Sequence, residues 1–156
     1  MPARAFDPPD PGFEARVRGS FAQQAMMRTL GAELVAVRAG EVEIALPFRS
    51  DLTQQHGYVH AAAITAIADS ACGYAAFTLM RADCEVLSVE FKVNLLAPAA
   101  GQRFVAHARV LRPGRTLTVC AAEVRAQHSG GDTLIAAIQA TMIAIPAAER
   151  RGRADP

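Results

Sequence analysis

The chain has 156 residues and a formal net charge of +1; 51% of its residues are hydrophobic and 20% are charged. This length suits one domain with a hydrophobic core, so we expect a single domain over residues 1–156. The near-zero net charge gives no reason to expect a nucleic acid or a membrane surface as a partner.

The first predicted element is a helix from Phe13 to Leu30. Four of the nine prolines precede it, within residues 1–11, and predict a mobile lead-in. Apolar residues then loosely follow a helical period, and Gly31 is suited to end the helix. Residues 33–48 alternate between apolar and polar side chains, which predicts strand structure with a turn or bulge at Ala39–Gly40.

The longest predicted element is a helix from Val59 to Met80. Its residues are almost all apolar or small, alanine dominates, and the run is longer than an ordinary strand. A helix that is apolar on nearly every side is expected to be buried on nearly every side. Asp69 at its centre argues against a membrane span, because an acid there is penalised in lipid.

Four strands are expected after this helix, at residues 89–95, 104–110, 120–127 and 133–145, and residues 147–156 resemble a flexible, solvated tail. Short connections indicate antiparallel neighbours. We therefore predict an α+β fold in which a curved sheet wraps one helix. A sheet of this size leaves one flank of the helix open, and a second copy of the chain could close it.

Asp69 is the leading candidate for catalysis. A buried carboxylate is costly without a partner, and apolar surroundings would raise its pKa and suit it to act as a general base or nucleophile. The alternative is a structural acid that pairs with an arginine or caps a loop.

His60 lies nine residues before Asp69, near the start of the same helix. If His60 is helical, the two side chains point to opposite sides and are roughly 13 Å apart along the axis. A site that contains both residues must then be assembled from two chains. The alternative for His60 is a hydrogen-bonded loop histidine.

The first turn of the helix is a candidate site for a carbonyl oxygen. The N–H groups of Ala61 and Ala62 are expected to be free donors, which would polarise such an oxygen together with the helix dipole. The alternative is that small side chains at this position serve only close packing.

Other chemistries are less favoured by the residues. His56 and His60 have no third ligand nearby, so no metal is expected. Cys72 is expected to be a buried thiol rather than a nucleophile. Four arginines could hold phosphates or lie on a solvated hairpin: Arg103, Arg109, Arg112 and Arg115.

The central segment resembles the hotdog-fold acyl-CoA thioesterases, particularly the branch of the phenylacetate-degradation thioesterases. That branch has Asn or Gln, then Gly-x-x-His-Gly-Gly, then an Asp within the helix. This chain has Gln54, then Gly57–Tyr58–Val59–His60–Ala61–Ala62, then Asp69. The strand from Ser88 to Pro98 also looks like the family's segment after the helix.

The resemblance implies a hotdog fold, an acyl-CoA substrate, no cofactor, and a homodimer or dimer of dimers with sites between chains. By position, Asp69 would activate water or attack the thioester, and Ser88 would help to hold the water. Gln54 and the N–H of Ala61 would bind the thioester carbonyl, while His60 supports the loop. Substrate contacts are expected at Gly57, Ala61, Ala62, Gly73, Arg112 and Arg115.

Two departures from the family pattern affect these roles. Ala61–Ala62 replaces Gly-Gly, which adds two methyl groups that would narrow the acyl channel or lower activity. Ser88 falls on the polar side of its strand's alternation, so it reaches the site only if the strand begins irregularly.

We expect an enzyme that hydrolyses an acyl-CoA to a free acid and CoA in the cytoplasm. The compartment follows from an odd number of well-separated cysteines and from the absence of an apolar run before Gly12. Two alternatives stay open: an enoyl-CoA hydratase or dehydratase, and a non-catalytic acyl-CoA-binding protein. The residues do not fix the acyl group, the choice of dimer or tetramer, or whether an acyl carrier protein replaces CoA.

Overall fold

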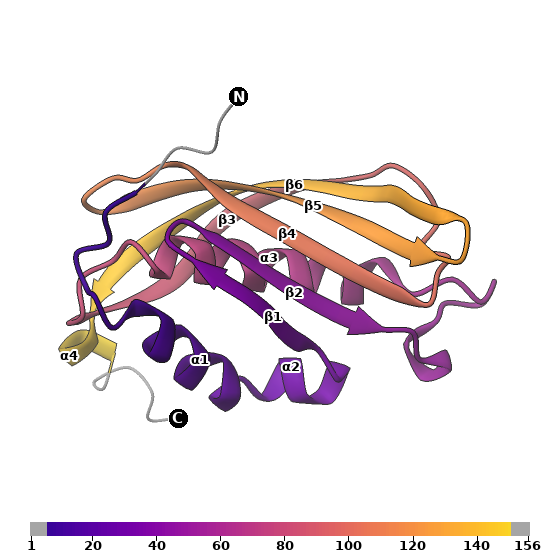
Figure 1. Cartoon of the computed structure of the whole chain (residues 1–156), viewed down its shortest axis with the longest axis horizontal. Helices are drawn as coiled ribbons and strands as arrows, with labels where there is room; N and C mark the ends of the chain where they lie inside the picture. The colour runs from indigo at the N-terminus through magenta and orange to yellow at the C-terminus, as the bar shows by residue number, and fades with distance from the viewer. Residues whose placement is uncertain (1–5, 151–156) are drawn as a thin grey trace.

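The computed structural model describes residues 6–150 as a six-stranded antiparallel sheet that curves around one long helix (Figure 1). This confirms the predicted α+β class and the hotdog arrangement. The elements in chain order are α1 (Phe13–Gln23), α2 (Ala25–Leu30), β1 (Glu33–Arg38), β2 (Glu41–Pro47), the 3-10 helix η1 (Ser50–Leu52), α3 (Ala61–Phe77), β3 (Cys84–Leu95), β4 (Arg103–Arg112), β5 (Leu117–His128), β6 (Gly131–Pro146) and α4 (Ala147–Arg150).

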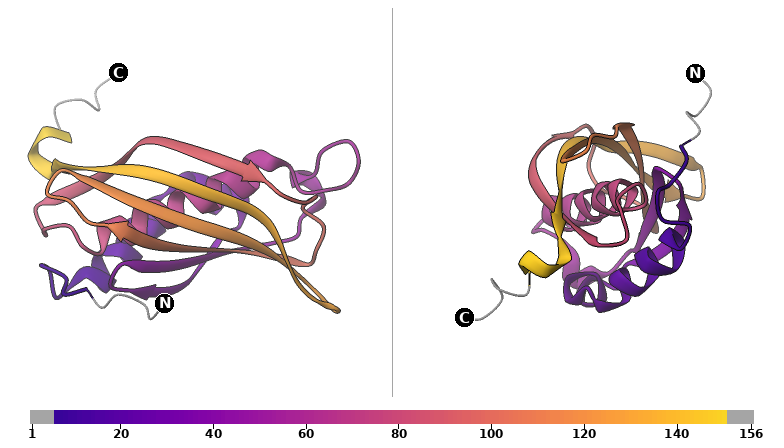
Figure 2. Two further views of the ribbon diagram at one scale, coloured as in Figure 1. Left: turned by 90° about the horizontal axis from the view of Figure 1, so that it is seen from above. Right: turned by 90° about the vertical axis from the view of Figure 1, so that its left-hand side faces the viewer.

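Helix α3 lies at the centre of the core, and Figure 2 shows the strands passing around it. Eleven of its 17 residues are buried, and their small side chains let the sheet approach closely. The helix is shorter at both ends than the predicted Val59–Met80, because His60 is an extended N-cap residue and α3 ends at Phe77. Within residues 6–150, no helix has the length and hydropathy needed to span a lipid bilayer.

The strand order is β1-β2-β4-β5-β6-β3. The prediction that consecutive strands are neighbours is right for β4–β5 and β5–β6 but wrong for β3–β4, because β3 pairs with β6 at the far edge. Residues 96–102 join β3 to β4 across the end of the sheet, where Val59 N donates to Ala99 O and Gln102 N donates to Gln127 O. The curvature of the sheet lets a short connection make this crossing.

The N-terminal helix is broken at Gln24, whose extended backbone (φ −76°, ψ 102°) separates α1 from α2. Gly31 ends α2 in the left-handed conformation with φ 72°, as a helix-terminating glycine is expected to do. Helix α1 covers part of the side of α3 that the sheet leaves open (Figure 2).

The two chain ends were expected to be mobile. Within the lead-in, Phe6 packs against the core and Asp10 forms an ion pair with Arg16. At the other end, residues 147–150 form the short helix α4. The other residues of the two predicted mobile segments, 1–5 and 151–156, lie outside the described part of the chain.

Strand β3 is an edge strand with several large apolar side chains exposed. The exposed fractions are 53% for Leu87, 53% for Val89, 43% for Phe91 and 57% for Leu95. An uncovered edge with an apolar surface is a site for association with another chain.

Arg16 joins α1 to the C-terminal end of α3. Its guanidinium donates to the carbonyl oxygens of Phe77, Met80 and Arg81 at 3.0, 2.8 and 2.6 Å, and its centre lies 4.2 Å from the centroid of the Phe77 ring. Carbonyl groups beyond the last helical turn have no partner within the helix, so one side chain satisfies several of them.

We predict that Arg16→Ala lowers the free energy of unfolding by roughly 2–4 kcal/mol, since each charge-assisted hydrogen bond is worth about 1.5–3 kcal/mol and such losses do not add fully. Urea unfolding measures the loss. The control is Arg18→Ala, which removes an exposed pair with Glu14 and should cost less than about 0.5 kcal/mol. Equal losses in the two variants would contradict the role given to Arg16.

Candidate active site

Asp69 lies in the middle of α3 and faces Ser88 of β3. The Ser88 hydroxyl donates to Asp69 Oδ1 at 2.8 Å. Both residues line a cavity of about 320 Å³ between α1, α3 and β3. Burial raises the pKa of Asp69 above its ordinary value, and the hydrogen bond from Ser88 opposes this rise. The cavity therefore presents a carboxylate that binds a proton more strongly than an exposed one.

A β-bulge explains how Ser88 reaches Asp69. In the β3–β6 register Ser88 pairs with Met142 and Glu90 pairs with Thr141, so Val89 is an extra residue. In an unbroken strand Ser88 would share the outer face with Glu90, because side chains alternate with a period of two. Strand β3 is therefore irregular at Ser88, as the predicted role of Ser88 in the site required.

A second cavity, of about 680 Å³, lies at the start of α3. The loop before α3 and the segment after β3 form its walls. Its lining is mostly apolar and consists of Gln54, Gln55, Tyr58, Val59, His60, Ala61, Ile64, Leu95, Leu96, Ala97, Pro98, Ala99 and Ile135.

The loop before α3 is held by its own hydrogen bonds. Gln54 N donates to Tyr58 O at 2.8 Å and Gly57 N donates to Gln54 O at 3.0 Å, with Gly57 at φ 83°. A left-handed turn of this kind favours glycine. The side-chain oxygen of Gln54 accepts from His56 N, so the amide nitrogen of Gln54 is the group available to a ligand.

His60 caps α3 with its ring. Nδ1 accepts from Ala62 N at 2.9 Å, so the neutral ring has its proton on Nε2. The prediction that both Ala61 and Ala62 present free N–H groups is therefore wrong for Ala62. In the described part of the chain Ala61 N–H makes no hydrogen bond, and Ala61 lines the larger cavity. A carbonyl oxygen placed there would meet this donor.

The predicted site residues fall into two groups that one chain does not bring together. Asp69, Ser88 and Gly73 line the smaller cavity, and Gln54, His60 and Ala61 line the larger one. His60 is not helical, so its predicted direction opposite to Asp69 does not apply. Ala61 and Asp69 are nevertheless far apart, because the eight helical steps between them rise about 12 Å along the helix axis.

Other predicted residues lie apart from both cavities. Arg112, at the end of β4, and Arg115, in the β4–β5 turn, are exposed and line neither cavity. The smaller cavity is also lined by three residues that no motif or spacing had indicated as site residues: Gln24, Ser70 and Tyr74. Ser70 was visible as a polar exception in an apolar helix, whereas Gln24 gave no signal.

The Cys72 thiol is buried within α3. Burial raises the pKa of the Cys72 thiol, as expected for an unreactive thiol.

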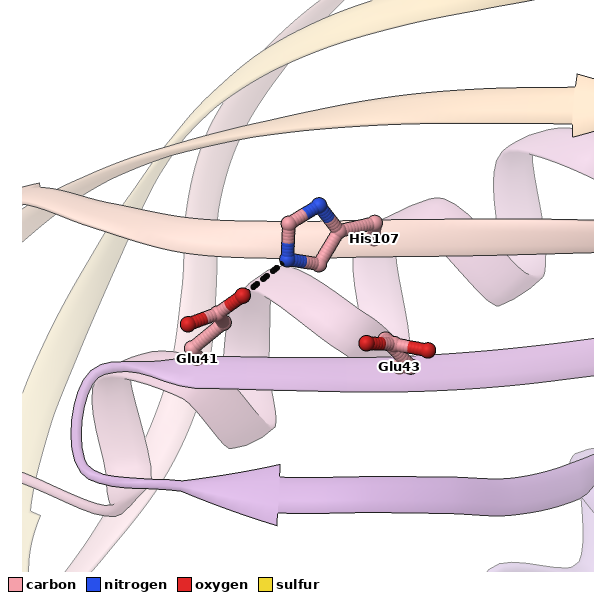
Figure 3. Close-up of side chains that lie close together, drawn as sticks. All are labelled: Glu41, Glu43 and His107. Atoms are coloured by element: carbon pink, nitrogen blue, oxygen red, sulfur yellow. Dashed lines mark hydrogen bonds and ion pairs between the residues drawn. The ribbon is translucent and has the colours of Figure 1, made fainter. Parts of the chain in front are cut away.

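Figure 3 shows Glu41, Glu43 and His107 on the outer face of the sheet, with donor atoms within 4.8 Å of one another. His107 binds Glu41, and Arg38 Nη1 lies 3.9 Å from Glu41 and 3.3 Å from Glu43. A guanidinium therefore already supplies the positive charge that a cation would bring.

Comparisons with known proteins identify similar chains. The family model described as the Thioesterase superfamily matches residues 56–132. A crystal structure of a thioesterase family protein from Silicibacter pomeroyi is 49% identical, with a TM-score of 0.85, over 86% of this chain and 99% of that one. The conserved protein PA5202 from Pseudomonas aeruginosa is 29% identical, with a TM-score of 0.72, over 78% of this chain and 94% of its own. The E. coli PaaI protein, from a phenylacetic acid degradation operon, is 17% identical over 85% of this chain and 93% of its own; its TM-score of 0.76 indicates a shared fold.

The raised pKa of Asp69 predicts that its charged form destabilises the fold. The folded chain binds more protons than the unfolded chain between the two pKa values, so stability falls as the pH rises through them. We predict that Asp69→Asn, which is uncharged at every pH, has a higher Tm than the wild type at pH 7. This gain should vanish as the pH falls below the ordinary value of 3.8.

Asp83→Asn is the control for this prediction, because Arg81 lowers the pKa of the exposed Asp83 carboxyl. This substitution should bring no gain at pH 7. A gain in both variants, or a gain for Asp69→Asn that is constant with pH, would contradict the account.

Proposed function

The chain belongs to the Thioesterase superfamily, and from this premise we propose that it hydrolyses an acyl-CoA thioester to a free acid and CoA. The observation that carries the proposal is the half-buried Asp69 carboxylate, fixed by Ser88 in the wall of a cavity. A base for thioester hydrolysis needs this combination of raised pKa and access to a small molecule.

In the proposed reaction Asp69 takes a proton from a water that the Ser88 hydroxyl helps to position. The water oxygen attacks the thioester carbon, and the carbonyl electrons move to the oxygen. Ala61 N–H and the amide of Gln54 stabilise this oxyanion. When the carbonyl re-forms, the carbon–sulfur bond breaks and the CoA thiolate leaves with a proton. Direct attack by the Asp69 carboxylate, followed by hydrolysis of the anhydride, uses the same groups.

A second copy of the chain supplies the other half of the site in this proposal. Strand β3 contributes Ser88 to the smaller cavity near one end and Leu95 to the larger cavity at the other. Antiparallel pairing of two β3 edges about a two-fold axis between Phe91 and Lys92 would place Ser88 of one copy opposite Leu95 of the other. The pairing is isologous, so a homodimer has two equivalent sites.

The proposal also assigns roles to two exposed arginines and to the loop before α3, and it places the enzyme in a cell compartment. Arg112 and Arg115 are exposed cations that would interact with the phosphates of CoA. Gly57 and Ala62 would shape the loop and helix start near the thioester. The cysteines Cys72, Cys84 and Cys120 are free, which suits the reducing cytoplasm.

We predict thiol release from at least one member of a panel of aryl and aliphatic acyl-CoAs. Asp69→Asn should lower kcat/KM by at least about 100-fold while its circular dichroism spectrum stays unchanged, because the base is lost and the shape is kept. Asp83→Asn, an exposed carboxylate outside both cavities, should keep wild-type turnover.

Three results would overturn the proposal. Normal turnover in Asp69→Asn would exclude this residue as base or nucleophile. Binding of acyl-CoAs without thiol release would favour the non-catalytic binding protein. Addition of water to an enoyl-CoA without thioester cleavage would favour the hydratase.

A further inference from the structure

The Ser88 hydroxyl has two acceptors for one proton. Its oxygen lies 2.8 Å from Asp69 Oδ1 and 3.4 Å from Met142 Sδ, and Ser88 is the donor in both contacts. A serine hydroxyl carries a single hydrogen, so it donates to only one of these atoms at a time. Which of the two atoms receives the proton depends on the charge of Asp69.

Met142 reaches Ser88 because of the strand register. The two residues are paired across β3 and β6, next to the bulge at Val89. Met142 is fully buried and belongs to the core cluster, so packing fixes the place of its sulfur. Ser88 lies on the exposed β3 edge of a single chain, and the proposed pairing of two β3 edges would exclude water from its hydroxyl.

The ionised carboxylate is the stronger of the two acceptors. A hydrogen bond to a charged group is roughly twice as strong as one between neutral groups, whereas a thioether sulfur is a weak acceptor. When Asp69 takes up a proton, its charge is lost and the hydrogen bond from Ser88 weakens. The sulfur of Met142 then competes for the Ser88 proton, and the Ser88 oxygen can accept from the new carboxylic O–H.

The other titratable groups around Asp69 come from α3 and β3. Tyr74 and Glu85 line the same cavity, and Cys72 lies three residues farther along the helix. Burial raises the pKa of the Cys72 thiol, which is therefore neutral at pH 7. The residues of α1 that line the cavity are uncharged, as is Met142 on β6. A test on Asp69 must therefore separate its titration from that of Glu85.

We propose that Met142 is a positioning residue for the base: its sulfur accepts the Ser88 hydroxyl while Asp69 holds a proton, and returns it to the carboxylate when that proton leaves. The inference rests on the proposed thioesterase function and adds a residue to its site. The proton that Asp69 takes from water leaves with the CoA thiolate. The Ser88 proton stays on its own oxygen and only changes direction, and no bond forms to the sulfur.

This arrangement makes Asp69 a stronger base. An acceptor that is used mainly while the carboxyl is neutral stabilises the neutral form, and so raises the pKa of Asp69. Burial acts in the same direction, whereas the hydrogen bond from Ser88 to the carboxylate lowers the pKa. The sulfur of Met142 offsets part of this lowering, because it gives the hydroxyl a second acceptor.

Met142→Leu tests the role, because it removes the sulfur and keeps an apolar side chain of similar volume. The pKa of Asp69 should fall by about half a unit, the effect of one weak hydrogen bond. Carbon-13 NMR of the side-chain carboxyl measures it, with Asp69→Asn to assign the signal. The acid limb of kcat/KM should move to lower pH by the same amount, since hydrolysis needs the ionised carboxylate. Its plateau should fall about twofold, because the base is weaker.

Three controls separate the hydrogen bond from packing and from other titrations. Met27→Leu makes the same chemical change at another buried methionine, on α2, and should leave both pH dependences unchanged. In a Ser88→Ala background, Met142→Leu should no longer shift the pKa of Asp69, because no hydroxyl is left to redirect. In a Glu85→Gln background, Met142→Leu should still produce the full shift.

Norleucine gives a second measurement in case leucine disturbs the core at position 142. Growth on norleucine replaces the five methionines by side chains of the same length, with a methylene group in place of each sulfur. The pKa of Asp69 should fall as in Met142→Leu. The Met142→Leu chain itself should show no further shift when it is grown on norleucine.

The outcomes separate this inference from the proposed function. A lower pKa of Asp69 in Met142→Leu, with no thiol release from any ester, would support the exchange of the hydroxyl and overturn the thioesterase. Thiol release with an unchanged pKa and an unchanged acid limb in Met142→Leu would overturn the inference alone. An equal shift in Met27→Leu, or in Met142→Leu without the Ser88 hydroxyl, would assign the effect to packing and would also overturn it.

Discussion

The burial of α3 on nearly every side is the constraint on which the rest of the structure depends. Its small apolar residues can be covered only by a sheet that curves, and the curvature brings β3 to the edge beside β6 rather than beside β4. The same burial raises the pKa of Asp69. The small apolar residues of α3 therefore account for the architecture, and the acid among them accounts for the chemistry that we assign to the site.

The length of α3 between its first turn and its middle also keeps the two cavities apart. Asp69 lies in the middle of α3 and the free N–H of Ala61 lies at its first turn, and a rigid helix keeps them about 12 Å apart. The exposed apolar edge of β3 borders both cavities, since Leu87 lines one and Leu95 lines the other. Association through this edge would cover the apolar side chains and join the two halves of the site in a single step.

Much of the fold could be predicted from local sequence patterns. Alternation in residues 33–48 and 89–145 indicated the strands, and the apolar run before Met80 indicated the central helix. The position of β3 could not be predicted, because a short connection normally joins neighbours and only the curvature of the sheet permits this crossing. The break at Gln24 was also missed, since the helical period continues on both sides of it.

The candidate-site residues that lie in one segment of the sequence could be predicted. Gln54, His60, Ala61 and Asp69 stood in one motif, and the structure places each of them at a cavity. The capping of Ala62 by His60 was missed, because a side chain that satisfies a helix donor is invisible in a spacing pattern. The pocket formed by Gln24, Gly73 and Tyr74 was also missed as a unit. Gly73 was expected to contact substrate, but the pocket is assembled from elements far apart in the sequence.

The central claim is that each reaction centre takes Asp69 from one copy and Gln54 from another. Chains with Asp69→Asn and chains with Gln54→Ala, each nearly inactive alone, are mixed in equal amounts and allowed to exchange subunits, with native mass spectrometry to count the mixed dimers. At statistical exchange half of the dimers are mixed, and each has one site with both residues intact, so thiol release should recover to about a quarter of the wild-type rate. Activity that stays at the sum of the two variants, with mixed dimers present, would show that both residues act within one chain and would contradict the account.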